Sequence, residues 1–279
     1  MKKACVIGWP IEHSRSPLIH NYWLKKYGID AAYEKKPVEP KDVSNFIVNL
    51  AHSEFIGCNV TIPHKESVFE AIGEADEIAR RLGAVNTVYL KNGKVRGTNT
   101  DGEGFIASLR YSYPAFSLKG KTAIIVGAGG AAKAIVGALL DEGVGRIGVI
   151  NRTRERILGL RGQFGSHVFE INEDTANDEL GNCELLVNTT SQGMHGQPPL
   201  DLEIQSLNRD AVVADIVYTP LETVFLEKAR NQGSPVLGGL GMLLHQAVRG
   251  FELWFGVKPE VTKELYELVA ADIQKVRKQ

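Results

Sequence analysis

Residues 122–156 read TAIIVGAGGAAKAIVGALLDEGVGRIGVINRTRER. The first five form an apolar run of strand length, glycines then make a turn, and residues 131–140 continue as an apolar run of helical length. A second strand is expected at 146–150. Glycines in such a turn let the backbone approach a pyrophosphate, whose charge the helix N-terminus stabilises. The order of elements therefore predicts a dinucleotide-binding unit, against the alternative of a glycine turn without a ligand.

The residues after the second strand indicate which dinucleotide is bound. A dinucleotide-binding unit usually presents Asp or Glu there to the ribose 2'-hydroxyl. This chain presents Asn151, Arg152, Thr153, Arg154 and Arg156. A carboxylate would repel a 2'-phosphate, whereas a guanidinium binds one through paired, charge-assisted hydrogen bonds. The pattern predicts NADP rather than NAD, unless these arginines only face solvent, and it leaves open whether Arg154 contacts the phosphate or water.

Composition and charge exclude several classes of protein. The chain has 279 residues and a formal net charge of -1, which suits two domains and gives no general attraction for nucleic acid or anionic lipid. The three cysteines, Cys5, Cys58 and Cys183, are odd in number and lack ligand spacing, which predicts reduced thiols in a cytoplasmic protein and no metal site. The apolar stretch 122–140 is interrupted by Lys133 and glycines, so we expect no membrane span.

Strands are expected to alternate with helices along the whole chain. Asn92 and Gly93 predict a hairpin turn, and strands near 185–188 and 212–217 continue the second half as a doubly wound sheet. The fold class is α/β with largely parallel sheets. In the first hundred residues we expect strands near 3–8, 31–36, 56–61 and 85–91, and helices that start near Ser16, Pro40, Pro63 and Glu74.

Polar side chains gather in four segments of the first half. Most of these segments follow expected strands, whose carboxyl ends bind ligands in an open α/β sheet. Ser16 is expected to be a helix N-cap with Pro17 as the first helical residue, a start suited to a carboxylate, although capping alone leaves Ser14 unexplained. Lys65 falls in the first turn of a helix, where it opposes the dipole, so it has either a local purpose or simple solvent exposure. The segments are HSRSPLIHN (13–21), NVTIPHK (59–65), GAVNTV (83–88) and GTNTDGEG (97–104).

In order and spacing, these segments resemble parts of the shikimate dehydrogenase family. The resemblance runs from Val6 to about Trp254 and includes GAGGAA (127–132), NRT (151–153), NTTSQGM (188–194) and GGLGMLLHQA (238–247). It implies reversible reduction of the C3 ketone of 3-dehydroshikimate by NADPH to give shikimate, a step of aromatic amino-acid biosynthesis. We expect a cytoplasmic protein, and the sequence leaves open whether it is a monomer or a homodimer.

The resemblance implies roles for individual residues as well. Lys65 and Asp101 would form the catalytic pair beside C3, since a proton donor is needed where a hydride leaves negative charge on oxygen. The sequence leaves open which of the two transfers the proton, and without the family pattern an ordinary ion pair would be the alternative. The substrate would contact Ser14, Ser16, Thr61, Asn86, Tyr218 and Gln246. The cofactor would contact Gly127, Gly129, Gly130, Ala131, Asn151, Arg152, Thr153, Arg156, Thr189, Ile216 and Gly239.

Gln246 has a consequence for the architecture, because it follows the dinucleotide unit yet must reach a substrate bound by residues 14–101. The final helices, about 242–255 and 259–276, are therefore expected to return to the first domain. We expect a discontinuous, mostly parallel α/β substrate domain of residues 1–104 and 239–279, and a Rossmann-like NADP domain of residues 105–238. The active site is expected in a cleft that closes around the reactants.

Two other functions stay open. One is a quinate/shikimate dehydrogenase with relaxed substrate or NAD use, which the Asn-Arg-Thr terminus and the intact Ser14 and Ser16 pair disfavour. The other is a dinucleotide-binding sensor without catalysis, which would have no need to retain Lys65 and Asp101 together.

Overall fold

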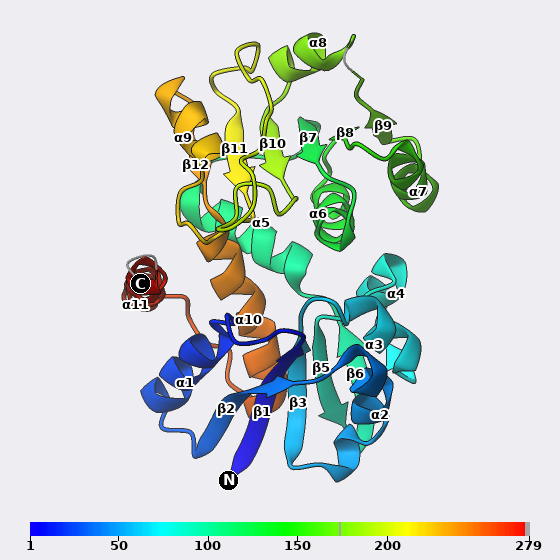
Figure 1. Cartoon of the computed structure of the whole chain (residues 1–279), viewed down its shortest axis with the longest axis vertical. Helices are drawn as coiled ribbons and strands as arrows, with labels where there is room; N and C mark the ends of the chain where they lie inside the picture. The colour runs from blue at the N-terminus through cyan, green and yellow to red at the C-terminus, as the bar shows by residue number, and fades with distance from the viewer. Residues whose placement is uncertain (173, 277–279) are drawn as a thin grey trace. The chain divides into compact units, whose positions relative to one another are not determined.

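The structure, a computed structural model, describes residues 1–172 and 174–276. Its contacts divide the chain into two compact units. The first unit comprises Met1–Asp101 and Leu244–Val269, and the second comprises Gly102–Leu243 with the segment that begins at Ala270. Both units are α/β, which confirms the expected fold class (Figure 1). Residues 102–104, 239–243 and the segment that begins at Ala270 were expected in the first domain but belong to the second unit.

A six-stranded sheet forms the first unit. Its strands are β1 (Lys2–Gly8), β2 (Ala31–Pro37), β3 (Phe55–Val60), β4 (Glu74–Ala75), β5 (Thr87–Lys91) and β6 (Lys94–Thr98), in the order β2-β1-β3-β5-β6-β4. β1, β2 and β3 run parallel as expected, but β5 runs antiparallel to both of its neighbours. Asn92 and Gly93 turn the chain between β5 and β6 with φ of 55° and 74°, which confirms the predicted hairpin.

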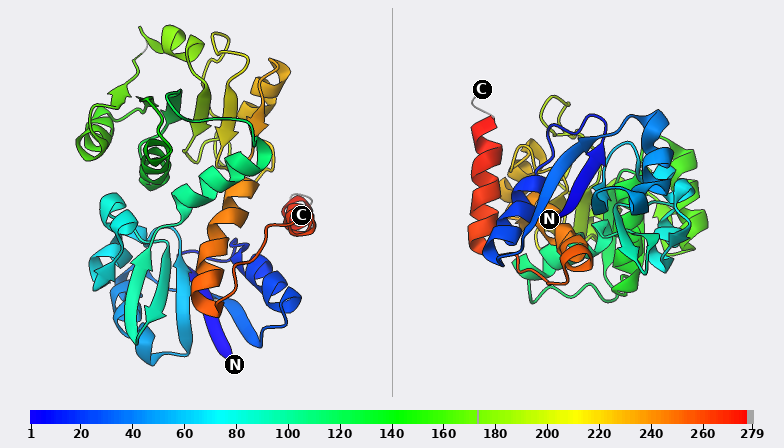
Figure 2. Two further views of the ribbon diagram at one scale, coloured as in Figure 1. Left: turned by 180° about the vertical axis from the view of Figure 1, so that it is seen from behind. Right: turned by 90° about the horizontal axis from the view of Figure 1, so that it is seen from below.

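Helices cover both faces of this sheet. On one face, apolar residues of α2 (Val43–Val48), α3 (Lys65–Ala71) and α4 (Glu77–Leu82) form a buried cluster with side chains of β1 and β3. On the other face, α1 (Ser16–Lys26) and α10 (Gly239–Phe255) bring Trp23, Phe251 and Trp254 around a fully buried His20. Figure 2 shows α10 lying across this face. Two short 3-10 helices, Pro40–Asp42 and Leu50–His52, flank α2.

Residues 244–269 return to the first unit, whereas the segment that begins at Ala270 does not. The Trp254 indole donates a hydrogen bond to the Val88 carbonyl (2.9 Å). It passes so close to Gly57 that an added Cβ there would lie 2.1 Å from the indole nitrogen. The Trp23 indole donates to the Glu260 carbonyl (3.0 Å), just before α11 (Lys263–Val276). Each of the two segments therefore supplies one indole donor and one backbone acceptor, and these two hydrogen bonds hold the returning segment on the first unit.

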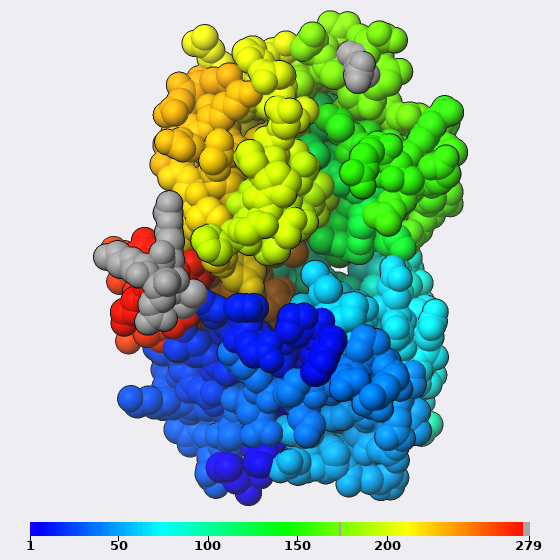
Figure 3. Space-filling view, viewed as in Figure 1, coloured from blue at the N-terminus to red at the C-terminus, as the bar shows by residue number. Residues whose placement is uncertain are grey.

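A fully parallel six-stranded sheet forms the second unit. Its strands are β7 (Thr122–Val126), β8 (Arg146–Ile150), β9 (Val168–Glu170), β10 (Leu185–Asn188), β11 (Val212–Asp215) and β12 (Val236–Leu237). The strand order is β12-β11-β10-β7-β8-β9. The chain adds β8 and β9 on one side of β7 and then β10, β11 and β12 on the other side, which confirms the doubly wound sheet. Buried clusters lie on both faces of the sheet, and Figure 3 shows the outer surface of the chain in space-filling form. Its helices are α5 (Asp101–Ser112), α6 (Gly130–Asp141), α7 (Arg154–Phe164), α8 (Ala176–Gly181) and α9 (Val224–Asn231).

The apolar stretch 122–140 is divided between β7 and α6, and both are buried in the core of the second unit. Within residues 1–172 and 174–276, no helix combines the length and apolarity that crossing a bilayer requires.

The expected helix start at Glu74 was wrong. Glu74 and Ala75 instead form β4, which pairs in parallel with Arg96 and Gly97 of β6. The helix begins only at Glu77, because the Asp76 carboxylate accepts the Ala79 N–H (2.9 Å) as its N-cap. Pairing with a strand distant in sequence decided the conformation at Glu74.

Candidate active site

Lys65 and Asp101 form an ion pair at one edge of the first sheet. Lys65 is the first residue of α3 and Asp101 is the first residue of α5. The lysine side chain keeps 28% of its surface exposed, whereas the aspartate side chain keeps 10%. An ammonium group that reaches solvent beside a shielded carboxylate can bind a ligand oxygen and give it a proton. The structure thus brings the two predicted catalytic residues into direct contact.

Strand direction explains why distant segments meet at this edge. β3 and β6 both run antiparallel to β5, so they end where β5 begins. β1 is parallel to β3 and ends at the same edge. All four polar segments of the sequence therefore lie together: those after β1, β3 and β6, and the one that enters β5.

Asn86, which directly precedes β5, links the ion pair to the sheet. Its Nδ2 donates to Asp101 Oδ1 (2.9 Å), leaving Oδ2 to Lys65. Its Oδ1 accepts from the Thr100 N–H and from the Thr87 hydroxyl, both at 2.9 Å. The Thr100 hydroxyl in turn donates to the Gln246 carbonyl (2.9 Å), so the predicted substrate residue on α10 lies beside this network.

The two serines after β1 differ from expectation at the helix start. The N-cap prediction for Ser16 was wrong, because α1 already includes Ser16. The Ser16 N–H donates to Ser14 Oγ (3.3 Å), so it is Ser14 that satisfies an amide at the helix start. Ser16 is nearly buried and Ser14 half-buried. Thr61, also half-buried, contacts the end of β1: an added Cβ on Gly8 would lie 2.7 Å from its methyl group.

The glycine turn of the second unit has the geometry that its sequence predicted. Gly127 has a φ of +105°, and a Cβ there would lie 2.7 Å from Thr189 Oγ1, so only glycine fits. Gly129 and Gly130 differ, because an added Cβ would meet nothing within 4 Å at either. The first hydrogen bond of α6 runs from the Lys133 N–H to the Gly129 carbonyl (3.0 Å), so the amides before it, including that of Ala131, are open to an anion.

The residues after β8 separate into paired and free arginines. Arg154 Nε donates to the Glu170 carboxylate (2.9 Å). Arg152 and Arg156 are exposed, and neither makes an ion pair with any residue that the structure describes. Asn151 and Thr153 flank Arg152, and Asn151 Nδ2 donates to the Thr153 carbonyl (2.8 Å). Two guanidinium groups beside the glycine-turn strand are therefore available to a phosphate.

Comparison with known proteins bears on both sites. Family models match the shikimate dehydrogenase substrate binding domain at residues 6–88, shikimate / quinate 5-dehydrogenase at 111–198, and the shikimate 5'-dehydrogenase C-terminal domain at 239–263. The shikimate dehydrogenase (NADP(+)) of Nitrobacter winogradskyi is 52% identical over 272 residues, which cover 98% of this chain and 97% of that protein. The chain belongs to the shikimate dehydrogenase family.

Solved structures of related enzymes have the same fold. The shikimate 5-dehydrogenase of Thermus thermophilus, in complex with NADP(H) and shikimate, has a TM-score of 0.86 and 32% identity, covering 98% of this chain and 100% of that one. The quinate dehydrogenase of Corynebacterium glutamicum, in complex with NAD, has a TM-score of 0.88 and 29% identity, covering 97% and 99%. Both ligand chemistries thus occur on this architecture.

In this shikimate dehydrogenase family member, the ends of β10 and β11 carry a network that sequence reasoning missed. The buried Asp215 carboxylate accepts from Asn188 Nδ2 (3.0 Å), the Val217 N–H (3.0 Å) and the Thr223 hydroxyl (2.7 Å). Burial nevertheless raises the pKa of Asp215 to about 6. The signal available in the sequence was an aspartate at the end of an apolar strand, in VVAD.

This network holds the segments that carry the remaining predicted residues. Thr189 follows Asn188 and donates to the Val126 carbonyl (2.7 Å). Ile216 follows Asp215, and its carbonyl lies so near Gly239 that an added Cβ would be 2.1 Å away. Tyr218, half-buried, lies on the same segment as Ile216.

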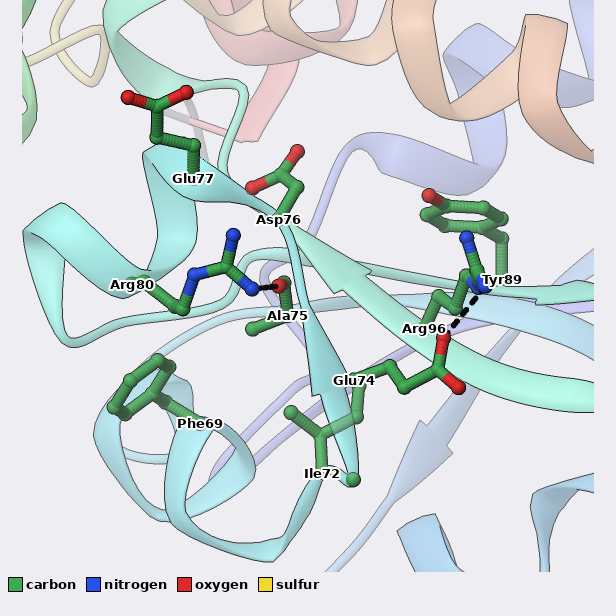
Figure 4. Close-up of a pocket in the computed structure, with 10 residues that line it drawn as sticks. Phe69, Ile72, Glu74, Ala75, Asp76, Glu77, Arg80, Tyr89 and Arg96 are labelled. Atoms are coloured by element: carbon green, nitrogen blue, oxygen red, sulfur yellow. Dashed lines mark hydrogen bonds and ion pairs between the residues drawn. The ribbon is translucent and has the colours of Figure 1, made fainter.

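One hollow in the first unit lies outside the family motifs. It has a volume of about 560 Å³ and is lined by Glu74, Arg80, Tyr89 and Arg96 among others (Figure 4). Its charges are largely satisfied internally, since Glu74 pairs with Arg96 (2.6 Å) and Arg80 donates to the Ala75 carbonyl (2.6 Å). None of the residues predicted for the active site lines it. In the described part of the chain, no three His, Cys, Asp or Glu side chains gather as a metal site.

Proposed function

We propose that this protein is an NADP-dependent shikimate dehydrogenase, which reversibly reduces 3-dehydroshikimate to shikimate in the cytoplasm. The Lys65–Asp101 pair carries the proposal, because it lies where the other polar segments of the first unit converge. The 52% identity to a shikimate dehydrogenase (NADP(+)) across almost the whole chain supports it. The expected oligomeric state is a monomer or a homodimer.

The first unit supplies the acid for the reaction. Reduction of the C3 ketone leaves negative charge on its oxygen, which the Lys65 ammonium can stabilise and then protonate. Asp101 holds that ammonium in place, and Asn86 fixes Asp101 through the second carboxylate oxygen. The proposed substrate contacts, with Ser14 and Ser16 at the carboxylate, are Ser14, Ser16, Thr61, Asn86, Tyr218 and Gln246.

The second unit fits NADP. Its glycine turn leaves open space where a pyrophosphate approaches the backbone, and the free guanidinium groups of Arg152 and Arg156 suit a 2'-phosphate. When bound, NADPH supplies the hydride. The proposed cofactor contacts are Gly127, Gly129, Gly130, Ala131, Asn151, Arg152, Thr153, Arg156, Thr189, Ile216 and Gly239.

Oxidation of shikimate tests the activity directly. Purified protein with shikimate and NADP⁺ should give a rise in absorbance at the nicotinamide band, and NAD⁺ or quinate should give much less. Lys65→Ala should lower kcat by roughly 10² or more, because the general acid is lost. Equal rates with quinate and NAD⁺ would instead favour the second candidate function, a quinate/shikimate dehydrogenase with relaxed specificity, which the similarity to the NAD-bound quinate dehydrogenase supports. No change in absorbance with any combination of shikimate or quinate and NADP⁺ or NAD⁺ would contradict both candidate functions.

The arginines after β8 test the cofactor assignment. Arg152→Ala should weaken NADP⁺ binding by roughly tenfold to a hundredfold and leave NAD⁺ binding almost unchanged, because a charge-assisted bond to the 2'-phosphate is lost. Arg154→Ala is the matched control, since Arg154 is already paired with Glu170. Titration calorimetry with both dinucleotides measures the difference. Equal losses for NADP⁺ and NAD⁺ would contradict the assignment.

A further inference from the structure

Three polar side chains lie next to one another on neighbouring strands of the first sheet, close to the ends of the strands that carry the Lys65–Asp101 pair. Thr87, the first residue of β5, is opposite Asn59 of β3 on one side and opposite Thr98 of β6 on the other. Opposite residues of antiparallel strands point to the same face. Here that face is covered by α10, since an added Cβ on Gly250 would lie 3.4 Å from the Thr87 methyl group. All three are buried. Buried polar groups on a sheet face need partners, so their hydrogen bonds are informative.

Two of the three belong to a chain of hydrogen bonds that ends at the catalytic pair. The Tyr33 hydroxyl, from edge strand β2, donates to Asn59 Oδ1 (2.6 Å). Asn59 Nδ2 donates to Thr87 Oγ1 (3.2 Å), and the Thr87 hydroxyl donates to Asn86 Oδ1 (2.9 Å). Asn86 Nδ2 then donates to Asp101 Oδ1 (2.9 Å). Every donation points toward Asp101, and bonds aligned in this way polarise and strengthen one another.

The direction of these hydrogen bonds fixes the orientation of the Asn86 amide. A hydroxyl has one proton, so once Thr87 accepts from Asn59, its own proton is directed to Asn86. If the Asn86 amide were turned over, its NH₂ would face the Thr87 hydroxyl and the Thr100 N–H, and its oxygen would face the Asp101 carboxylate. The contacts with the Thr100 N–H and with the Asp101 carboxylate would both be repulsive, and the Thr87 proton would lose its acceptor. Thr87 therefore helps keep the amide donor on Asp101.

The first donor in this series of hydrogen bonds, the Tyr33 hydroxyl, stays protonated. Tyr33 is almost fully buried and stacks on His20, with ring centroids 4.1 Å apart. Burial raises the pKa of Tyr33 well above its ordinary value, so its hydroxyl keeps its proton throughout the working range. Burial also lowers the pKa of His20 to about 3, so no positive charge forms beside the phenol.

We propose that Thr87 is a positioning residue for the reaction, with Asn59 and Tyr33 behind it. Through Asn86 it sets the position of Asp101, and through Asp101 that of the Lys65 ammonium. It touches neither the substrate nor the cofactor in this role. The inference rests on the proposed function, because it assigns a role in the same proton-transfer step.

The test compares variants of Thr87 that differ only in the hydroxyl. Thr87→Val keeps the shape and removes the hydroxyl, and we expect kcat for shikimate oxidation to fall on the order of tenfold, with KM within about twofold. Thr87→Ser restores a hydroxyl and should recover most of kcat. Thr98→Val is the matched control: Thr98 lies opposite Thr87, and its hydroxyl makes no hydrogen bond to the residues described here. It should leave kcat near wild type.

A double-mutant cycle separates positioning from loss of packing. In an Asn86→Ala background the chain is already broken, so adding Thr87→Val should change kcat by less than about twofold. A purely structural effect of Thr87→Val would persist in that background. Tyr33→Phe breaks the same series of hydrogen bonds at its first donor. It should lower kcat by roughly twofold to fivefold at unchanged KM.

Several outcomes would overturn the proposal while leaving the proposed function intact. One is a Thr87→Val enzyme with wild-type kcat. Another is Thr87→Ser as impaired as Thr87→Val, or Thr98→Val as impaired as either. If Thr87→Val does not fold, an unchanged kcat in Tyr33→Phe would be decisive against it. Inactivity of the wild-type protein would instead contradict the proposed function itself.

Discussion

Asp215 is a buried carboxylate whose ionisation should leave a measurable trace in stability. Burial raises the pKa of Asp215 to about 6 in the folded protein, against the lowering effect of its three hydrogen bonds. In the unfolded chain it titrates near its ordinary value of about 3.9. Between these values the folded state binds more protons than the unfolded state, so the contribution of Asp215 to the unfolding free energy falls as pH rises from about 4 to about 6 and is level above that.

Asp215→Asn removes the titration and keeps an amide oxygen for the Asn188 and Val217 donors. Relative to wild type, the free energy of unfolding of this variant should therefore increase by about 3 kcal/mol between pH 4 and pH 6 and then stay constant. Any fixed change in hydrogen bonding adds an offset that does not depend on pH. Urea unfolding of both proteins across this range gives the difference. Exposed Asp210→Asn is the control, and parallel curves for wild type and Asp215→Asn would contradict the prediction.

The residues predicted for catalysis carried a clearer signal in the sequence than the residues around them. Lys65 and Asp101 were singled out because they lie in specific motifs after strands, and the structure places them in contact. Thr87 was not found, because its role depends on facing Asn59 across two strands, and sequence does not give that register. Arg154 was left open for a similar reason: Arg154 begins α7, and its partner Glu170 ends β9, whose place beside β8 the sequence does not give.

At the scale of elements, α10 is held on the first sheet by a close approach at one glycine. Gly57 of β3 lies under Trp254, and a Cβ there would also be 2.3 Å from the Val88 carbonyl. Gly57→Ala should therefore displace the indole, break its hydrogen bond to Val88 and lower the free energy of unfolding by about 3 kcal/mol. Urea unfolding followed by tryptophan fluorescence measures this.

Gly73→Ala is the control for that substitution, because nothing lies within 4 Å of an added Cβ at Gly73. It should change the free energy of unfolding by less than about 0.5 kcal/mol. A Gly57→Ala protein as stable as Gly73→Ala would mean that α10 is not held by this contact.

Elements with strong local signals were predicted correctly, and those fixed by distant partners were not. The hairpin at Asn92 and Gly93 depends on two residues that accept positive φ, and it formed as expected. The strand, glycine turn and helix at 122–141 likewise carry their own pattern. β4 has only two residues and exists because β6 lies beside it, so local sequence favoured a helix there. The expected strand at 212–217 was two residues too long, since β11 ends at Asp215 and the side chain of Asp215 accepts the Val217 N–H.

For the whole molecule, the two units differ in how their cores are assembled. The buried residues of the two apolar clusters in the second unit all lie between Phe105 and Leu237, in one continuous segment. The first unit needs two segments, because one face of its sheet is covered by α10 and by the residues around Glu260. Without 244–269, the aromatic side chains of Trp23 and Tyr33 would lose much of their cover.

The difference predicts how fragments behave. Residues 102–243 alone should fold and unfold in one cooperative thermal transition, because their core is complete. Residues 1–101 alone should show no cooperative transition, since they expose a large apolar face. A short glycine-serine linker from 101 to 244 should restore folding of the first unit, because the Thr100 hydroxyl bonds to the Gln246 carbonyl (2.9 Å) and the two ends therefore lie close together. Circular dichroism melting of the three chains decides the matter: a cooperative transition in 1–101 alone, or none in the linked chain, would mean that the returning segment does not complete this core.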